Sequence, residues 1–299
     1  MAKNKILDKV SEILLVFLVF GLPLFFAPIL TDSFEFGKQI FLLVSSFLVF
    51  VVWAVKSLIT KKLTFQKTPY LVSTFLFLLS FLASTLINSP NKTNSFAAPV
   101  GTGALLLVTL VYILISNLGK SKLLLLSILA GAGLTSFVSL ILLFGNFSFP
   151  LNFPSLNLVI PQTWSPTGSL ISQVVFLLVA VVIGFGLIYE EIKKKNFPFT
   201  AILFTVNILL LSGLAASLHL LTSAKIVLLP QSTAWAIAVE SLKSGRIAFF
   251  GLGPGEFIHA FTSFKPLYFN NSEYWNIRFA SSSNWYFQVL TEIGRSKLL

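Results

Sequence analysis

The chain has 299 residues, of which 56% are hydrophobic and only 10% are charged. A soluble domain carries about 25% charged residues, so this chain lacks the polar surface that a water-soluble protein needs. The net charge of +11 is spread over the loops and forms no compact basic patch, so nucleic acid is not an expected partner. The absence of cysteine excludes disulfides and cysteine-ligated metal sites. Composition therefore predicts an all-α, polytopic integral membrane protein.

Seven apolar runs follow one another along the chain, each close to the ~20 residues that a helix needs to cross a bilayer. They cover residues 12–30, 39–59, 70–88, 103–118, 123–145, 169–189 and 199–222. The lysines before the first run resemble the start of a signal peptide. That run is long and contains Pro23, however, so we expect a retained span.

The lysines indicate which connections face the cytoplasm. With the amino terminus inside, the inner segments hold twelve lysines: Lys3, Lys5, Lys9, Lys56, Lys61, Lys62, Lys67, Lys120, Lys122, Lys193, Lys194 and Lys195. The outer connections before residue 223 hold only Lys38 and Lys92. Cytoplasmic loops carry an excess of basic residues. We therefore expect a transmembrane domain over residues 1–222 and an extracytoplasmic segment over residues 223–299.

One outer connection, residues 146–168, contains four prolines and no charged residue. This composition predicts an irregular loop. It is either a simple connector or a segment that dips into the membrane interface beside Trp164.

The extracytoplasmic segment begins with a short predicted helix, STAWAIAVESLKSG. Its apolar face is expected to contain Trp235, Ala238, Val239 and Leu242. Ser232 or Thr233 is a suitable first cap, and Gly245 a suitable end. Such a helix either lies along the membrane surface or packs on the other spans.

A glycine-rich stretch, GLGPGEF, covers residues 251–257. No strand precedes it and Pro254 interrupts it, so it does not fit a Rossmann or P-loop motif. Gly251, Gly253 and Gly255 provide a backbone that bends sharply and approaches a ligand or another helix closely. A plain tight turn is the alternative.

The last segment combines an arginine with a predicted helix. Arg278 lies between Trp275 and Phe279, and its guanidinium suits either a phosphate or lipid headgroups. The serines at 281–283 can cap a helix, and after them an apolar face is expected to contain Trp285, Tyr286, Val289, Leu290 and Ile293. Asn284 stands at the start of this helix and Gly294 just past its end.

Asn284, followed after nine residues by Gly294, resembles the second half of the His-Asn-nine-residue-Gly signature of the O-antigen ligase and polymerase family (Wzy-C type). The Trp235 segment and the glycine-rich turn are similar to that family's large external loop, which also follows several spans. The resemblance covers most of the chain in architecture and is specific across about residues 231–294.

The resemblance implies a polytopic enzyme of the bacterial cytoplasmic membrane that makes cell-envelope polysaccharide. It would transfer a glycan from a polyprenyl pyrophosphate donor to an acceptor hydroxyl on a glycan, lipid or protein, at the outer face of the bilayer. No metal or other cofactor is implied. Arg278 matches an arginine that binds the donor's pyrophosphate, and Asn284 and Gly294 match the signature. The further expected substrate-binding residues are Trp235, Arg246, Gly251, Gly253 and Gly255.

Two features depart from the family pattern. Ser283 stands where the family has its catalytic histidine, and a serine hydroxyl is a poor general base near neutral pH. His259 or Glu256 then supplies the base, or ionisation of the donor drives the reaction, or the chain does not catalyse it; His259 is equally read as an exposed loop residue. The family also continues with further spans after its signature, so we expect a truncated member or a longer reading frame.

A non-enzymatic membrane protein is the competing interpretation, either a transporter or an assembly partner in surface-glycan export. Transporters usually carry ionisable residues within their spans and show internal repeats. The first six apolar runs contain almost no ionisable residues in their interiors, and no repeat is visible. The glycan-transfer interpretation is therefore favoured.

Overall fold

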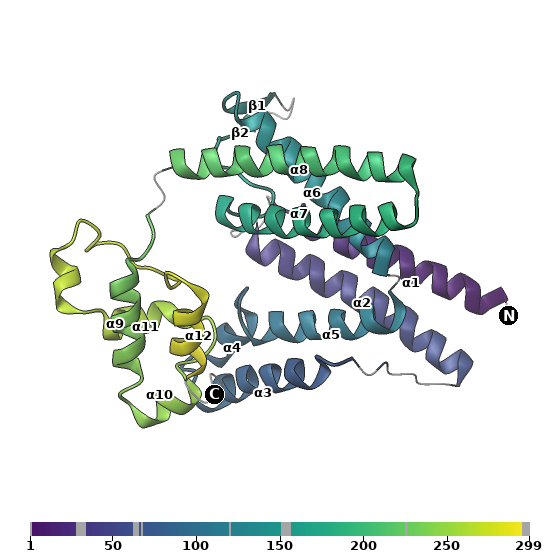
Figure 1. Cartoon of the computed structure of the whole chain (residues 1–299). Coiled ribbons are helices and arrows are strands. Elements are labelled where there is room, and N and C mark those ends of the chain that lie inside the picture. The colour runs from purple at the N-terminus through teal and green to yellow at the C-terminus, as the bar shows by residue number, and fades with distance from the viewer. Residues whose placement is uncertain are drawn as a thin grey trace. The chain divides into compact units, whose positions relative to one another are not determined.

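The computed structural model describes residues 2–27, 34–61, 66, 68–119, 121–150, 157–224 and 227–294 (Figure 1). The chain forms two compact units. The first contains Met1–Thr64 and Asn117–Ile226, and the second contains Phe65–Ser116 and Val227–Leu299. Each unit brings together segments that are far apart in the sequence.

The first unit is built on long helices and a hairpin. Its helices are α1 (Ala2–Gly21), α2 (Glu35–Thr60), α6 (Ser121–Leu142), α7 (Leu170–Lys193) and α8 (Phe197–Ser223). Helices α6, α7 and α8 pack around a core of Leu129, Ala132, Leu177, Ala180 and Leu210. Glycine permits the close packing, because a Cβ added at Gly213 would lie 2.3 Å from the Cβ of Ser136.

A neutral polar network runs through these three helices. The buried Gln173 amide donates hydrogen bonds to the Thr135 carbonyl and to the hydroxyls of Ser139 and Ser217. Its own oxygen accepts a hydrogen bond from Ser165. Gln173 thereby joins all three helices through hydrogen bonds in which no charged group takes part.

An ion cluster joins one end of α6 to the α7–α8 turn. The carboxylate of Glu191, which is only 1% exposed, lies 2.8 Å from Lys122 Nζ and 3.4 Å from Lys194 Nζ. Asn196 donates to its second oxygen at 3.1 Å. The paired lysines offset the cost of burying this carboxylate.

Five helical stretches are long and apolar enough to cross a membrane, judged over the described residues. They are Glu35–Thr60, Lys92–Leu118, Ser121–Leu142, Leu170–Lys193 and Phe197–Ser223. The apolar helix Leu71–Ile87 is shorter, with 17 residues. These helices make the chain a multi-pass helical membrane protein, with five clear spans where the sequence predicted seven.

The prediction for the first apolar run is wrong in its bounds. Helix α1 ends at Gly21, two residues before Pro23, instead of continuing to residue 30. Proline disfavours the helical conformation of the residue before it, which explains the early end. Residues 28–33 lie outside the described part of the chain. The helix also begins ten residues early, through a charged stretch that apolarity could not reveal.

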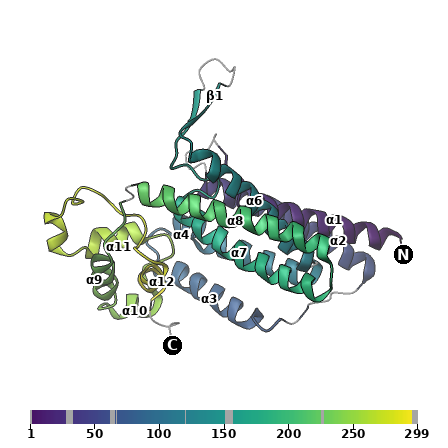
Figure 2. The same cartoon turned by 45° about the horizontal axis from the view of Figure 1, so that its top comes forward.

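The predicted irregular loop 146–168 instead contains an antiparallel hairpin of β1 (Phe147–Pro150) and β2 (Asn157–Ile160). Phe147 pairs with Ile160, and Pro150 with Asn157. Figure 2 shows the hairpin extending away from the helices of this unit. Trp164, which follows it, packs edge-on against Phe26 with ring centroids 5.6 Å apart. The phenylalanines of β1 and the β-branched Val159 and Ile160 of β2 favour strand pairing despite Pro150.

The second unit combines apolar helices with a group of short ones. Its elements are α3 (Leu71–Ile87), α4 (Lys92–Ala97), α5 (Thr102–Leu118), α9 (Gln231–Ser241), α10 (Gly245–Phe250), α11 (Phe257–Phe264), the 3-10 helix η1 (Leu267–Asn271) and α12 (Trp285–Ile293). Figure 1 shows α9 to α12 gathered at one end of α3. The short helices share a core of Ile237, Phe257, Phe261 and Phe269. Residues 227–294 therefore have a packed interior of their own, joined to α3.

Candidate functional site

The glycine-rich turn packs directly against the end of α12. Gly251, Gly253 and Gly255 all have positive φ angles, of 67°, 110° and 74°. A Cβ at Gly251 would lie 2.1 Å from the Glu292 carbonyl oxygen, and one at Gly253 would lie 2.8 Å from the Ser89 Cβ. The sequence prediction that these glycines permit sharp bending and close approach to another helix is confirmed.

Helix α12 begins and ends at the two signature residues. The Asn284 side chain accepts a hydrogen bond from the Phe287 amide at 2.9 Å, which caps the first turn. Gly294 follows the last residue with a φ of 82°. A Cβ there would lie 2.8 Å from the Ala248 carbonyl oxygen, so both residues have structural reasons to be present.

The buried face of α12 contains polar side chains beside Ile293, so the predicted apolar face is correct at Ile293 and wrong at Trp285 and Tyr286. Gln288, Thr291 and Glu292 are buried, whereas Trp285 is 52% exposed and Tyr286 is 74% exposed. The Glu292 side chain is buried against the glycine-rich turn, where its carboxylate accepts hydrogen bonds from the backbone amides of Gly255 and Phe257. Thr291 and Glu292 offer carbonyl oxygens to the amides of Leu252 and Gly253, at 3.1 and 2.9 Å.

Two buried carboxyl groups, those of Glu256 and Glu292, lie where the glycine-rich turn packs against α12, and the charge of Glu256 acts on Glu292. The Glu292 carboxylate accepts hydrogen bonds from Gln288, at 2.8 Å, and from the backbone amides of Gly255 and Phe257. Glu256 lies between those two amides in the sequence and accepts a hydrogen bond from Asn94 Nδ2 at 3.0 Å. Both glutamates are buried. The turn, α4 and α12 thus enclose a carboxyl pair.

The pKa of Glu292 is raised from 4.5 to about 7, chiefly by burial, and the nearby charge of Glu256 contributes to this rise. The hydrogen bonds from Gly255, Gln288 and Phe257 act in the opposite direction but do not cancel this effect. A carboxyl with a pKa near 7 can accept and release a proton at physiological pH. Such groups concentrate at functional sites, although structural networks also contain them.

The end of α3 is bonded to the same turn. Ser84 donates to the Glu292 carbonyl at 2.7 Å, and Asn88 Nδ2 donates to the Gly251 carbonyl at 2.6 Å. Arg246 Nη2 donates to the Ile87 carbonyl at 2.7 Å. These contacts fix the turn and α12 at the last turn of α3.

The remaining predicted site residues lie at the surface of the second unit. Arg278 and His259 are exposed, and Arg246 is exposed except for its bond to α3. Phe279, beside Arg278, packs against Phe261 with ring centroids 5.7 Å apart, which anchors the loop that carries the guanidinium. The His259 backbone amide donates to the Glu256 carbonyl at 3.0 Å, but within the described residues no hydrogen bond or ion pair joins the side chain of His259 or Arg278 to the carboxyl pair.

The predicted face of the Trp235 helix is displaced. Helix α9 buries Ala234, Ile237, Ala238 and Ser241, while Trp235 and Val239 are exposed. The helix begins at Gln231 after Pro230 instead of at a serine or threonine cap, and Gly245 starts α10 instead of ending α9. Proline before a helix fixes the entry of the chain without a side-chain cap.

The serines ahead of α12 do not cap it, contrary to the prediction. The hydroxyl oxygens of Ser282 and Ser283 are shielded from solvent and have no hydrogen-bond partner. The Ser282 backbone amide donates to Gln288 Oε1 at 2.8 Å. Ser283 is therefore a neighbour in sequence of the cap Asn284, with its hydroxyl available for a further partner.

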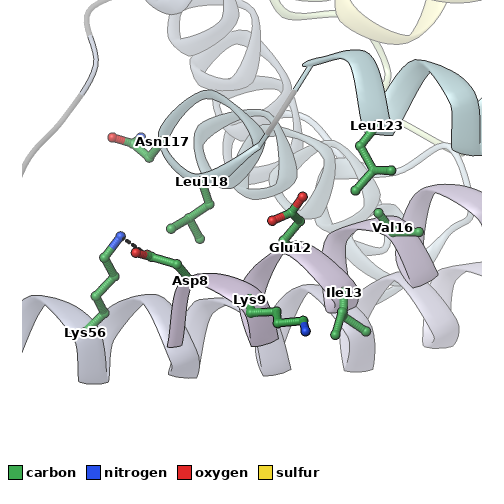
Figure 3. A pocket seen from close by; sticks show the side chains of 9 residues that line it. All are labelled: Asp8, Lys9, Glu12, Ile13, Val16, Lys56, Asn117, Leu118 and Leu123. Atoms are coloured by element: carbon green, nitrogen blue, oxygen red, sulfur yellow. Dashed lines mark ion pairs between the residues drawn. The ribbon is translucent and has the colours of Figure 1, made fainter. Parts of the chain in front are cut away.

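A cavity of about 770 Å³ lies in the first unit (Figure 3). Asp8 pairs with Lys56 at 2.5 Å on one side of it, and Lys9 and Glu12 stand nearby. Ile13, Val16, Leu118 and Leu123 complete its apolar wall. In the part of the chain that the structure describes, no three histidine or carboxylate side chains gather closely enough to hold a metal ion.

Glu292 is the residue that sequence reasoning missed. The apolar periodicity of α12 predicted that a different face of the helix is buried, so Glu292 was not among the predicted site residues. Its position eight residues after the cap Asn284 would have placed it two turns along α12, but not against the glycine-rich turn.

Comparison with protein-family models, with characterised proteins and with solved structures gives no match for this chain.

Proposed function

We propose that this chain is an O-antigen ligase-like glycosyltransferase of the bacterial cytoplasmic membrane. It transfers a glycan from a polyprenyl pyrophosphate carrier to an acceptor hydroxyl on a glycan, lipid or protein at the outer face. The multi-pass helical architecture and the folding of Asn284–Gly294 as one capped helix support this proposal. The signature residues are brought together with the glycine-rich turn that the same family resemblance singled out.

The proposed topology has the amino terminus inside and residues 227–294 outside. The lysine asymmetry along the sequence supports it, because basic residues resist translocation. The ion cluster of Lys122, Glu191 and Lys194 lies at helix ends assigned to the inner side. An outer location gives residues 227–294 access to the headgroup of a lipid-linked donor.

In the proposed reaction, the acceptor oxygen forms a bond to the anomeric carbon of the donor sugar. The bond from that carbon to the pyrophosphate oxygen breaks, and the pyrophosphate leaves on its lipid. The proton of the acceptor hydroxyl passes to a base. Arg278 stabilises the departing pyrophosphate, because a guanidinium binds two phosphate oxygens at once.

The observation that carries the proposal is the carboxyl pair Glu256 and Glu292. A base acts best when its pKa lies near the operating pH, and that of Glu292 is about 7. This pair therefore takes the role that the family gives to histidine at the position of Ser283. Both carboxyls are buried, so the role requires the turn containing Gly253 to move when the acceptor binds.

Transfer from a polyprenyl pyrophosphate-linked glycan, measured in membranes that contain the complete reading frame, tests the proposal. Glu292→Gln is expected to reduce transfer by roughly 10²–10⁴-fold, the usual contribution of a general base. Arg278→Lys is expected to reduce it by about 10-fold or more, since one ammonium cannot replace the two-pronged contact. Glu273→Gln and Lys243→Arg, at exposed positions of the same segment, are the matched controls. Full activity in both test variants contradicts the proposal.

A further inference from the structure

The exposed face of α12 is the unusual surface of the second unit. A helix on a water-soluble surface exposes its polar side chains and buries its aromatic ones. Helix α12 departs from this rule, because it buries Glu292, which is 2% exposed, beside Ile293 and leaves Tyr286 74% exposed. Neighbouring α11 follows the ordinary rule, since it buries Phe257 and Phe261. The exposure of aromatic side chains therefore distinguishes α12 from α11. These side chains need an apolar environment around them.

Helix α9 extends this aromatic surface. The ring of Trp235 lies 5.5 Å from that of Phe287, which follows Tyr286 in the sequence. Trp235 is 52% exposed, as is Trp285 at the start of α12. One turn further along α9, Val239 is also exposed. We call Trp235, Trp285 and Tyr286 the aromatic surface.

The end of α3 indicates where the aromatic surface lies along the bilayer normal. Helix α3 contains no charged residue and exposes Leu79, Leu86 and Ile87, as expected of a helix that faces lipid. Ser84, in its last turn, donates a hydrogen bond to the Glu292 carbonyl of α12. Figure 1 shows α12 lying across the end of α3 instead of continuing along it. Helix α12 is therefore held at the level where an apolar helix ends.

Two kinds of chemistry match the boundary layer of a bilayer. Tryptophan and tyrosine concentrate at that level, where the ring contacts acyl chains and the polar atom contacts headgroups. Arg246 is attached to the same end of α3 through Ile87, and its exposed guanidinium suits lipid phosphates. We infer that the aromatic surface binds the headgroup–hydrocarbon boundary of a phospholipid bilayer and holds α9 and α12 against it.

Fluorescence quenching in the reconstituted full chain tests this inference. The four tryptophans other than Trp285 are replaced by phenylalanine, and the protein is placed in vesicles of phosphatidylcholine and phosphatidylglycerol. Bromine atoms on the acyl chains near the headgroup are expected to quench Trp285, while aqueous iodide is expected to have little effect. A variant that keeps only Trp53 of α2 is the control for a membrane-embedded tryptophan.

Two outcomes overturn the inference. Quenching by iodide with no quenching by brominated lipid means that the surface faces water. Protection from both quenchers means that a second copy or another protein covers it. Because the multiple replacements could disturb folding, Tyr286→Trp in an otherwise tryptophan-free chain supplies an independent reading at the adjacent position. The result does not depend on catalytic activity, so the inference stands or falls separately from the proposed function.

Discussion

The two units bury polar side chains in different ways. In the first unit, Gln173 links Ser139 and Ser217 through neutral groups, and the buried carboxylate Glu191 is paired with lysines at a helix end. In the second unit, Glu256 and Glu292 are buried together and bonded to amides. A neutral network can be satisfied within hydrocarbon at low cost, whereas a carboxyl group there is expensive. The contrast agrees with a first unit surrounded by lipid and a carboxyl cluster outside the hydrocarbon.

The largest expected effect comes from the turn that holds the carboxyl cluster. Gly251→Ala places a Cβ 2.1 Å from the Glu292 carbonyl oxygen at a residue whose φ is 67°. The backbone conformation alone costs about 1–3 kcal/mol, and the clash adds to it. We expect the purified protein to unfold at a much lower temperature in detergent. Gly245→Ala, where an added Cβ meets nothing within 4 Å, should leave the melting temperature close to that of the wild type.

The next effect is a pH dependence. Because the folded-state pKa of Glu292 is about 7 and its ordinary value is 4.5, the unfolded chain loses the proton first as pH rises. The contribution of Glu292 to the free energy of unfolding is therefore fully present below about pH 4.5 and is lost as the pH rises to about 7. The difference corresponds to about 3 kcal/mol at 1.36 kcal/mol for each pKa unit. Glu292→Gln should flatten melting temperature against pH in that window.

Glu273→Gln is the control for this pH dependence, since Glu273 lies at an exposed position of the same unit. It should retain the wild-type slope. An unchanged slope in Glu292→Gln would mean that another group causes the dependence, and would contradict the raised pKa of Glu292.

A smaller effect is expected at the start of α12. Asn284→Ala removes the hydrogen bond to the Phe287 amide and should cost about 1 kcal/mol. Asn284→Ser should recover most of the loss, because serine caps helices equally well. Urea or thermal unfolding of both variants measures the difference. A serine variant as unstable as the alanine variant would contradict the capping role.

The smallest effect is expected at Asn207, which is compared with a second buried amide of the first unit, Gln173. Gln173→Leu breaks bonds to Ser139, Ser217 and Thr135, and hydrogen bonds between membrane helices are worth about 0.6 kcal/mol each. Asn207 is buried, and neither its oxygen nor its nitrogen has a partner. Asn207→Leu should therefore leave the melting temperature unchanged or raise it. Equal destabilisation by both variants would contradict the difference between the hydrogen-bonded amide of Gln173 and the amide of Asn207, which has no partner.

Apolar runs predicted six helices of the described residues, α2, α3 and α5 to α8, within four residues at each end, because length and hydrophobicity are local properties. They failed at α1, whose first half is charged but still helical, and whose end depends on Pro23. Similarly, Asn284 and Gly294 marked the ends of α12 correctly, because caps act on adjacent backbone groups. Elements that depend on nearby sequence were therefore accessible to prediction.

The sequence did not predict which face of α12 is buried. Contacts with the turn at Gly251–Gly255, which lies about forty residues earlier in the sequence, determine that face. These contacts bury Gln288 and Glu292 and leave Trp285 exposed, against the apolar pattern of the helix. The same contacts create the carboxyl pair. Periodicity gives the faces of a helix, but not which face meets which partner when backbone groups need acceptors.

Cysteine labelling in intact cells tests the location of the carboxyl cluster most directly, because the chain has no cysteine of its own. Glu273→Cys and Lys193→Cys place single thiols at exposed positions, the first in the extracytoplasmic segment and the second at the end of α7 assigned to the cytoplasm. We expect a membrane-impermeant maleimide to label residue 273 in intact cells, and residue 193 only after permeabilisation. Labelling of residue 193 from outside, or protection of residue 273 until cells are opened, would contradict the assignment of the carboxyl cluster to the outer face.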